Sequence, residues 1–295
     1  MINAMTVDVE DYFHVSALSR AIPRSDWPRM EFRAETSTRR ILDMFDTAGV
    51  KGTFFVLGWV ADRAPGLIRE IAARGHEVAC HGWSHELVYR QERVVFREEA
   101  RRCKALLEDI AGQEVLGYRA ASYSITKDSM WALDDLIDLG FQYDSSIFPI
   151  HHDRYGIPGA SREPGLIQAP SGRSIVEFPL TAAELFGQRV PCSGGGYFRL
   201  LPFGVTRRLL TRVNQKDGLP FIFYLHPWEI DPDQPRVKAG LLSSFRHYNN
   251  LDVCAHRLVR LLDSFEFGTV AQVLQSLGLR ALSRSPAATP AAAAG

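Results

Sequence analysis

The sequence predicts an α/β fold in which a parallel sheet closes into a barrel, and three observations support this prediction. Short apolar runs alternate with longer amphipathic runs over about 250 residues, which is the pattern of repeated βα units. A chain of 295 residues is long enough for one such barrel. Third, six polar side chains fall at or just after the ends of predicted strands, a set that fits a ring better than a linear crevice: Asp8, Glu10, His81, Arg119, Asp144 and His226.

The first half of the chain alternates regularly between strands and helices. Buried apolar runs predict strands over residues 2–9, 52–57, 77–80, 115–118 and 141–143. Apolar residues at helical spacing predict helices over 36–48, 93–110 and 127–139, and a further one that ends at Gly75. Gly49 and Gly140 also follow helical runs, as expected because glycine is the residue that most often ends a helix.

A change of composition then predicts an insertion. Over residues 147–200, Pro and Gly are frequent and helical periodicity disappears, so we expect loops and short strands, one of them over 174–180. The alternation resumes with strands over 220–225 and 265–270 and helices over 203–214, 251–264 and up to Leu277. We therefore expect one barrel domain over 1–280 and a disordered Ala/Pro/Ser tail over 281–295.

Two motifs that are far apart in the sequence together predict a metal site. Residues 6–11 (Thr-Val-Asp-Val-Glu-Asp) place three carboxylates at the end of an apolar strand, and residues 81–85 (His-Gly-Trp-Ser-His) place two imidazoles four positions apart. Two neutral histidines and one carboxylate commonly bind a divalent metal and leave positions open for water and substrate. A second carboxylate remains to act on the water. The pattern predicts a metal-dependent hydrolase.

Composition excludes several other classes of protein. The hydrophobic fraction of 46% and the charged fraction of 23% are those of a soluble globular protein. Lys+Arg and Asp+Glu balance at 34 each, so no net field favours nucleic acid or an anionic membrane. We find no signal peptide and no apolar run near the ~20 residues of a membrane span. The four scattered cysteines indicate reduced thiols, so a cytoplasmic protein is expected; its oligomeric state stays open.

The chain resembles the polysaccharide deacetylases of carbohydrate esterase family four over roughly residues 1 to 280. Five motifs carry the resemblance in the family's order: residues 6–13 (Thr-Val-Asp-Val-Glu-Asp-Tyr-Phe), 81–85, 117–124 (Gly-Tyr-Arg-Ala-Ala-Ser-Tyr-Ser), 143–149 (Tyr-Asp-Ser-Ser-Ile-Phe-Pro) and 224–229 (Tyr-Leu-His-Pro-Trp-Glu). Residues 194–200 and 246–251 look like features of the branch found in bacterial exopolysaccharide loci linked to an exosortase. The resemblance implies a distorted (β/α)7-type barrel and removal of N-acetyl groups from amino sugars of an exopolysaccharide or its precursor.

The resemblance also implies a set of metal ligands. His81 and His85 match the family's metal-binding histidines, and Glu10 matches the second acid of an acid-x-acid pattern. In an extended strand, Glu10 points to the same side as Asp8 and Asp11 points away, but a turn after Val9 would bring Asp11 to the metal instead. The metal implied is zinc, with Co²⁺, Ni²⁺, Mn²⁺ and Fe²⁺ as the other candidates.

By the same resemblance, four residues take part in catalysis. Asp8 matches the general base, and Arg119 matches the arginine that keeps this acid ionised. His226 matches the histidine that protonates the departing amine, and Asp144 matches the acid that orients this histidine. Ala121 stands where the family usually has a proline.

An N-acetylated oligo- or polysaccharide is the partner implied. Four residues are expected to contact it: Ser122, whose backbone N–H is a candidate oxyanion donor, together with Tyr123, Trp228 and His14.

Three other hypotheses stay open. A hydrolase of the same fold could cleave a small linear or cyclic amide, imide or ureide. Two histidines and a carboxylate also suit the Fe(II) of a non-haem oxygenase. A non-catalytic carbohydrate-binding barrel is the third, but it would need neither the acid at position 8 nor His226.

Overall fold

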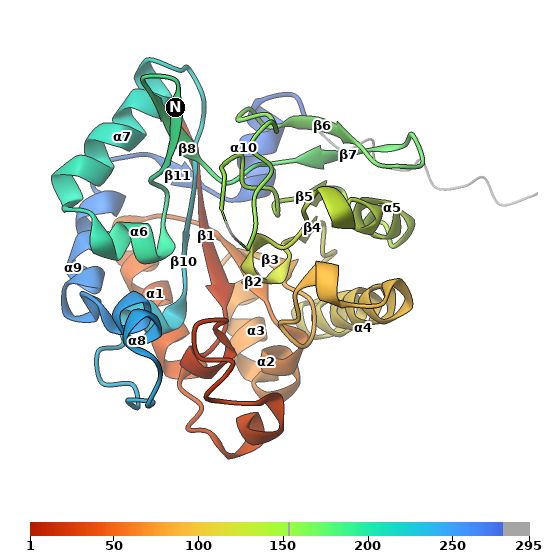
Figure 1. Cartoon of the computed structure of the whole chain (residues 1–295), viewed down its shortest axis with the longest axis vertical. Coiled ribbons are helices and arrows are strands. Elements are labelled where there is room, and N and C mark those ends of the chain that lie inside the picture. The colour runs from red at the N-terminus through yellow and green to blue at the C-terminus, as the bar shows by residue number, and fades with distance from the viewer. Residues whose placement is uncertain (153, 280–295) are drawn as a thin grey trace, which may run out of the picture.

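The computed structural model describes residues 1–152 and 154–279 and has an α/β fold built on one curled, mostly parallel sheet (Figure 1). The predicted tail, 281–295, lies outside the described residues. The strands of the sheet are β1 (Asn3–Val9), β2 (Thr53–Val56), β3 (Glu77–Cys80), β4 (Gly117–Tyr118), β5 (Tyr143–Asp144), β6 (Gly165–Gln168), β7 (Ser174–Glu177), β10 (Ile222–Leu225) and β11 (Phe267–Gly268).

The strand order agrees with repeated βα units. The sheet runs β10-β1-β2-β3-β4-β5-β7-β6, and β11 also pairs with β1. All residues of β1, β2 and β10 are buried, as is typical of parallel strands that are covered on both faces. Parallel pairing sets Val7 beside both Phe54 and Leu225, which fixes the register of the central strands.

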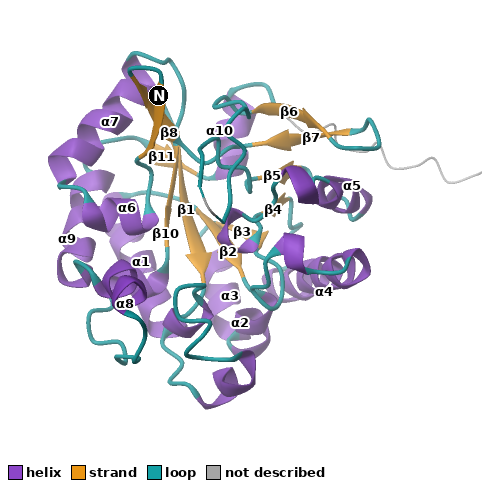
Figure 2. Cartoon of the chain, in the orientation of Figure 1, coloured by secondary structure: helices purple, strands orange, loops and turns teal. Residues whose placement is uncertain are grey.

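Helices surround the sheet (Figure 2). They are α1 (Ala34–Ala48), α2 (Gly58–Arg63), α3 (Pro65–Ala73), α4 (Arg93–Ala111), α5 (Trp131–Asp138), α6 (Gly195–Leu200), α7 (Phe203–Gln215), α8 (Leu241–Tyr248), α9 (Leu251–Leu262) and α10 (Val270–Ser276). The long helices α1, α4, α7 and α9 agree with the periodicity of the sequence. Gly49 ends α1 with φ +66°, a left-handed conformation that glycine adopts without steric cost. Among the described residues, no helix is both long enough and apolar enough to cross a membrane.

The distorted barrel predicted from the sequence is confirmed as a fold class, but the sheet is open on one side. Within the described residues no pairing joins β10 to β6, the two ends of the strand order. The last strands form an antiparallel hairpin, β6–β7, in place of another βα unit. A second hairpin, β8 (Ala182–Leu185) with β9 (Gln188–Pro191), forms a separate two-stranded sheet. These hairpins account for much of the insertion predicted over 147–200.

Two helices were not predicted. The helix α6 begins in a run of three glycines, which ordinarily disfavours a helix. Gly194 has φ +142°, and a Cβ there would lie 1.9 Å from the carbonyl oxygen of Tyr224, so only glycine fits. Three apolar side chains of α8 are exposed: Leu241, Leu242 and Phe245. They do not pack into the core, so the apolar spacing of this helix does not mark a buried face.

Short 3-10 turns complete the loops at the carboxyl ends of the strands. They are η1 (Tyr12–His14), η2 (Arg24–Arg29), η3 (Val88–Arg90), η4 (Ala121–Tyr123), η5 (Lys127–Ser129) and η6 (Pro227–Ile230). Two of them directly follow site motifs: η1 follows the acidic residues after β1, and η6 follows His226.

Candidate active site

The carboxyl ends of β1, β3 and β10 meet at a cavity of about 450 Å³, which we call the central cavity. Its walls include Asp8, Glu10, His81, His85 and His226. Asp8 lies in β1, His81 directly follows β3, and His226 directly follows β10. The residues come together because adjacent parallel strands end at the same edge of the sheet. Four of the six strand-end residues singled out in the sequence thus line one cavity, while Arg119 and Asp144 lie behind it.

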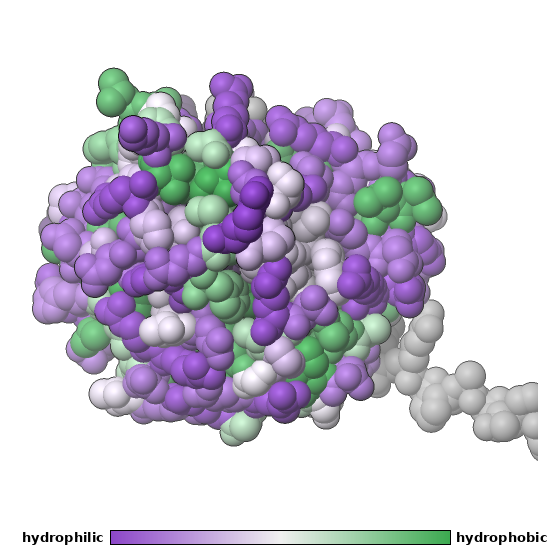
Figure 3. Space-filling model, turned by 90° about the horizontal axis from the view of Figure 1, so that it is seen from below, coloured by the Kyte–Doolittle hydropathy of each residue, from purple (hydrophilic) through white to green (hydrophobic). Residues whose placement is uncertain are grey.

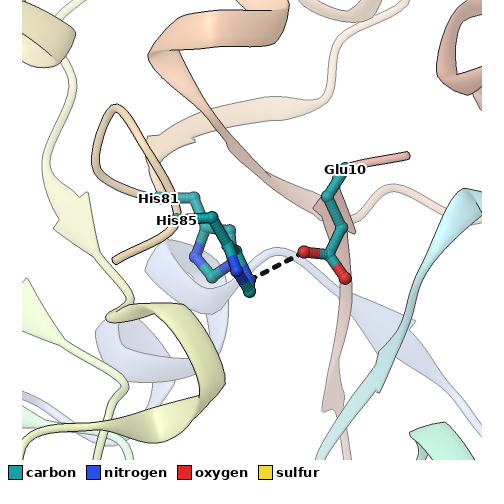
Figure 4. Close-up of side chains that lie close together, drawn as sticks. All are labelled: Glu10, His81 and His85. Atoms are coloured by element: carbon teal, nitrogen blue, oxygen red, sulfur yellow. Dashed lines mark ion pairs between the residues drawn. The ribbon is translucent and has the colours of Figure 1, made fainter. Parts of the chain in front are cut away.

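Glu10, His81 and His85 form a compact group at this cavity (Figure 4). One ligand atom from each residue lies within 4.8 Å of the others, as a shared cation requires. The Nε2 atom of His85 is 2.7 Å from Glu10 Oε2, yet that buried oxygen accepts no hydrogen bond from the described residues. His81 Nδ1 lies 2.8 Å from the carbonyl oxygen of Arg119, so its Nε2 is left for a metal. The three side chains fit a divalent cation.

The conformation of the loop after β3 brings His85 into this group. Gly82 has φ +74° and His85 has φ +52°, so two residues of the motif are left-handed. A non-glycine residue in this conformation costs roughly 1–2 kcal/mol. Strain of this kind is typical of functional sites, where the surrounding structure holds a residue in place.

Burial and neighbouring charges set the protonation of the three residues. Burial lowers the pKa of the His81 imidazole to about 4, despite the opposing effect of Asp8 and Glu10. His81 is therefore neutral at pH 7, as a ligand must be. Burial alone would raise the pKa of Glu10, but His85, His226 and His81 outweigh it and lower the pKa below its usual range. Glu10 is therefore a carboxylate.

Asp11 has a different partner set from Glu10. Its Oδ1 accepts from the Tyr12 N–H at 2.9 Å, and its Oδ2 accepts from the N–H groups of Arg33 and Ala34 at 2.6 and 2.7 Å. The side chain thus caps both η1 and the start of α1. With both oxygens occupied and directed away from the histidines, Asp11 is not a ligand in this structure, and the geometry favours Glu10.

Asp11→Ala is expected to lower the free energy of unfolding by about 2–4 kcal/mol, because it removes a buried cap shared by two helical segments. Metal content, measured after dialysis, should stay at the wild-type level. Denaturant unfolding gives the first quantity. Loss of the metal with unchanged stability would show that Asp11, and not Glu10, is the ligand.

Asp8 and Arg119 form a buried pair beside the metal group. Arg119 Nη1 lies 2.7 Å from Asp8 Oδ1 and also donates to Thr6 Oγ1, while Nη2 and Nε bind Ser145. The guanidinium is fully buried. The second oxygen of Asp8, Oδ2, lies 3.5 Å from the hydroxyl of Tyr123 and 3.8 Å from His226 Nε2. This oxygen is the one that is available for proton transfer.

His226 is oriented by Glu229, which the sequence analysis did not identify. His226 Nδ1 lies 2.9 Å from Glu229 Oε2, and Glu229 Oε1 accepts a 2.7 Å bond from Arg199 Nε. The turn η6 begins directly after His226. This turn brings Glu229 next to the imidazole of His226, in a capping-box arrangement. The spacing His226-Pro-Trp-Glu229 is the sequence signal that could have identified this acid.

The prediction that Asp144 orients His226 is wrong. Asp144 accepts hydrogen bonds from the hydroxyl and N–H of Ser146, at 2.6 and 3.2 Å, and pairs with the buried Glu177. Burial raises the pKa values of both acids, and Asp144 further raises that of Glu177, so the pair retains a proton. Because β5 pairs with β7 in the register that sets Asp144 beside Glu177, the partners of this carboxyl come from β7 and Ser146 and not from His226.

The charge on His226 suits a proton donor. Burial by itself lowers the pKa of the imidazole, but the carboxylates of Glu10, Glu229 and Asp8 outweigh burial and raise it to about 9. The Nε2 atom lies 3.6 Å from Glu10 Oε1 and 3.8 Å from Asp8 Oδ2. Trp228 stacks on the ring at a centroid distance of 5.2 Å, and its Nε1 donates to Glu10 Oε1 at 3.2 Å.

The remaining predicted substrate residues are divided between two cavities. Ser122, Tyr123 and Trp228 line the central cavity. Ser122 and Tyr123 both have left-handed backbones, with φ +50° and +55°, in the turn that follows Arg119. His14 does not line this cavity but lines a second one that adjoins it, so its contact with substrate stays a prediction. Its Nδ1 accepts from the Asp11 N–H at 2.7 Å, and its ring packs edge-on against Trp27 and Trp59.

Two family profiles match adjacent parts of the chain. Residues 26–143 match the profile described as polysaccharide deacetylase. Residues 145–275 match a profile described as a domain of unknown function, DUF3473. His81, His85 and Arg119 lie in the first match, and His226 and Glu229 lie in the second.

Several curated proteins share part of the sequence. A peptidoglycan-N-acetylglucosamine deacetylase of Bacillus cereus is 32% identical over 92 residues, which cover 31% of this chain and 32% of the relative. A peptidoglycan deacetylase of Helicobacter pylori is 28% identical over 132 residues, 43% of this chain and 42% of the relative. A chitooligosaccharide deacetylase of Bradyrhizobium is 32% identical over 88 residues, 30% of this chain and 40% of the relative. Each match spans less than half of the relative's length.

Solved structures confirm the fold over nearly the whole chain. A Mycobacterium smegmatis protein assigned to the polysaccharide deacetylases superposes with a TM-score of 0.61 at 21% identity and covers 95% of this chain and 93% of that one. The Puue allantoinase superposes with a TM-score of 0.56 at 14% identity and covers 92% and 88%. At these identities the likeness shows the fold alone.

Proposed function

We propose that this chain, in which residues 26–143 belong to the polysaccharide deacetylase family, is a metal-dependent N-deacetylase of amino sugars in an exopolysaccharide or its precursor. One observation carries the proposal: the Glu10–His81–His85 group, Asp8 and His226 all meet at the central cavity, with Arg119 bound to Asp8 from behind it. The names of the curated relatives, which are deacetylases of peptidoglycan and chitooligosaccharide, support the choice of reaction.

A divalent cation held by Glu10, His81 and His85 would supply Lewis acidity to the attacking water and to the acetyl carbonyl. The two-histidine, one-carboxylate set suits zinc, and Co²⁺, Ni²⁺, Mn²⁺ or Fe²⁺ would also fit it. The Nδ1 contact of His81 with a carbonyl oxygen keeps its other nitrogen directed at the cation.

Asp8 acts as the general base. Arg119 binds Oδ1, which leaves Oδ2 to take a proton from the attacking water. General acid–base transfer of this kind typically contributes about 10²–10⁴-fold to the rate. The hydroxyl of Tyr123 lies 3.5 Å from Oδ2 and is the hydrogen-bond donor to it.

His226 acts as the general acid. Its Nε2 faces the carboxylates of the cavity, and from there it can donate a proton to the nitrogen of the departing amine. Glu229 stabilises the imidazolium through Nδ1, and Arg199 fixes Glu229 in turn. We assign the backbone N–H of Ser122 to the oxyanion, since Ser122 lines the same cavity.

Acetate release from a panel of N-acetylhexosamine oligosaccharides, with and without a chelator, tests the proposal. We expect release that stops on chelation and returns with zinc, also in the absence of oxygen. Turnover of a cyclic ureide or imide without acetate release would assign the site to a small amide. A requirement for oxygen and Fe(II) would assign it to an oxygenase.

Glu229→Gln is expected to lower kcat for acetate release about 10²-fold, because the imidazolium of His226 loses its charged partner. Asp144→Asn is the matched control and should leave kcat per folded molecule within a few-fold of wild type. Both are measured by acetate release on protein of equal metal content. If Asp144→Asn lost the activity and Glu229→Gln kept it, the assignment of Glu229 would be refuted.

A further inference from the structure

A second cavity, of about 1200 Å³, adjoins the central cavity. The residues that line both cavities are Ser16, Ala17, His85, Ser122 and Arg154. His85 belongs to the metal group, so the second cavity lies beside that group. This cavity lies among the loops beyond the carboxyl ends of the strands, on a face where hydrophilic side chains predominate (Figure 3).

Separate segments of the chain bring positive charge to this second cavity, which we call the basic cavity. Its lining includes one residue between η1 and η2, the first residue of η2, the last residue of η3, one residue before β6 and one before α8: Arg20, Arg24, Arg90, Arg154 and Lys238. Glu86 is the one acidic residue of the described lining, and Arg24 binds it at 2.6 Å.

The other cations of the basic cavity have no acidic partner within residues 1–152 and 154–279. Among the residues that the structure describes, Arg20, Arg90, Arg154 and Lys238 form no ion pair. Other described arginines, such as Arg40 and Arg207, also lack an ion pair, but these four cations line one cavity that adjoins the metal group.

A local excess of positive charge in a chain with no net charge has a physical consequence. A concave surface lined by one sign of charge concentrates ligands of the opposite sign. The cations surround a cavity and do not extend along an exposed stripe, so the geometry suits a compact anionic group better than a nucleic acid backbone.

We propose that the basic cavity is a subsite for an anionic group, a phosphate or a carboxylate, carried by the N-acetylated sugar chain that reacts at the central cavity. The inference rests on the proposed function and adds a substrate class to it. The anionic group lies on a sugar next to the one that is deacetylated, because the two cavities share Ser16 and His85. Arg90 and Lys238 approach it from different loops and would bind it as charge-assisted donors.

Three N-acetylglucosamine tetrasaccharides test this subsite: a neutral one, one with a reducing-end phosphate and one with a glucuronate unit. For the wild-type zinc enzyme we expect at least one anionic substrate to have a KM about tenfold below that of the neutral one, with similar kcat. This advantage should shrink as salt is raised, since exposed charges are screened. The substrate that gains identifies phosphate or carboxylate as the group.

The variant Arg90→Gln/Lys238→Gln should lose most of this KM advantage and leave turnover of the neutral substrate unchanged. Arg40→Gln, an exposed arginine of α1 outside the basic cavity, is the matched control and should behave as wild type. Equal KM values for all three substrates in the wild type, or an advantage that survives in the double variant, would overturn the subsite.

Calorimetric binding of the same anionic tetrasaccharides separates this proposal from the proposed function. Binding to the zinc enzyme that is weakened about tenfold in Arg90→Gln/Lys238→Gln, without any acetate release, would support the subsite and refute the deacetylase. Acetate release from all substrates with no effect of the double variant on either measurement would support the deacetylase and refute the subsite.

Discussion

Replacing Asp8 by asparagine is expected to lower kcat for acetate release by about 10²–10⁴-fold while the metal stays bound. The amide keeps the size of the side chain and one acceptor oxygen for Arg119, but it cannot take a proton from water. Oδ2, the atom that loses its basicity, is the oxygen of Asp8 that faces the cavity without a charged partner closer than 3.8 Å. The acetate assay on oligosaccharide substrates measures this loss.

Asp8→Asn needs two controls, since Arg119 is fully buried and would lose its counter-charge. Circular dichroism and metal analysis establish that the variant is folded and loaded. Asp263→Asn, on an exposed residue directly after α9, should show wild-type kinetics. Full activity of a folded, metal-loaded Asp8→Asn protein would defeat the mechanism.

Removing an imidazole of the metal group is expected to have the second large effect. His81→Ala should reduce bound zinc to less than about a tenth of an equivalent after dialysis, and acetate release should fall by more than about 10³-fold. Without His81, only Glu10 and His85 remain as ligands, which are too few to retain the cation. The carboxylate of Glu10 is then left in the cavity without a cation. Metal analysis and the acetate assay on the same sample report both losses.

The control for His81→Ala is His256→Ala, an exposed histidine of α9 that lies outside the central cavity. It should retain one equivalent of zinc and full activity. Glu10→Gln should resemble His81→Ala, because the structure brings both side chains to the same point. A His81→Ala protein with stoichiometric zinc and unchanged acetate release would refute the assignment of Glu10, His81 and His85 as the metal site.

The sequence predicted the parts of the site that depend on strand ends. Strand periodicity located β1, β3 and β10 to within two residues at each end, and the motifs at their carboxyl ends then had to meet. The choice between Glu10 and Asp11 depended on backbone geometry, because alternation along a strand predicts a direction only up to the last paired residue. The structure adds that the Asp11 side chain caps η1 and the start of α1. Hydrophobic periodicity does not predict such bonds.

The missed residues share a physical cause. Arg199 binds Glu229, which binds His226. The i, i+3 spacing of His226 and Glu229 is a sequence signal, but nothing in the sequence links Arg199 to them. Asp144 was expected in that role because of its motif, but its direction is set by pairing with β7, a contact between distant segments. The open side of the sheet was missed for the same reason, since closure depends on pairings that local sequence does not encode.

The bonds of Arg199 connect separate parts of the second half of the chain around Glu229, the partner of His226. From α6 its guanidinium reaches Glu229 and the carbonyl oxygens of Arg246, His247 and Asn249, all within the segment matched by the domain of unknown function. A fragment that stopped near residue 143 would keep both histidines of the metal group yet lack His226 and the side chains that steady it. The second segment is therefore no detachable module, and exchange between relatives would have to transfer both segments together.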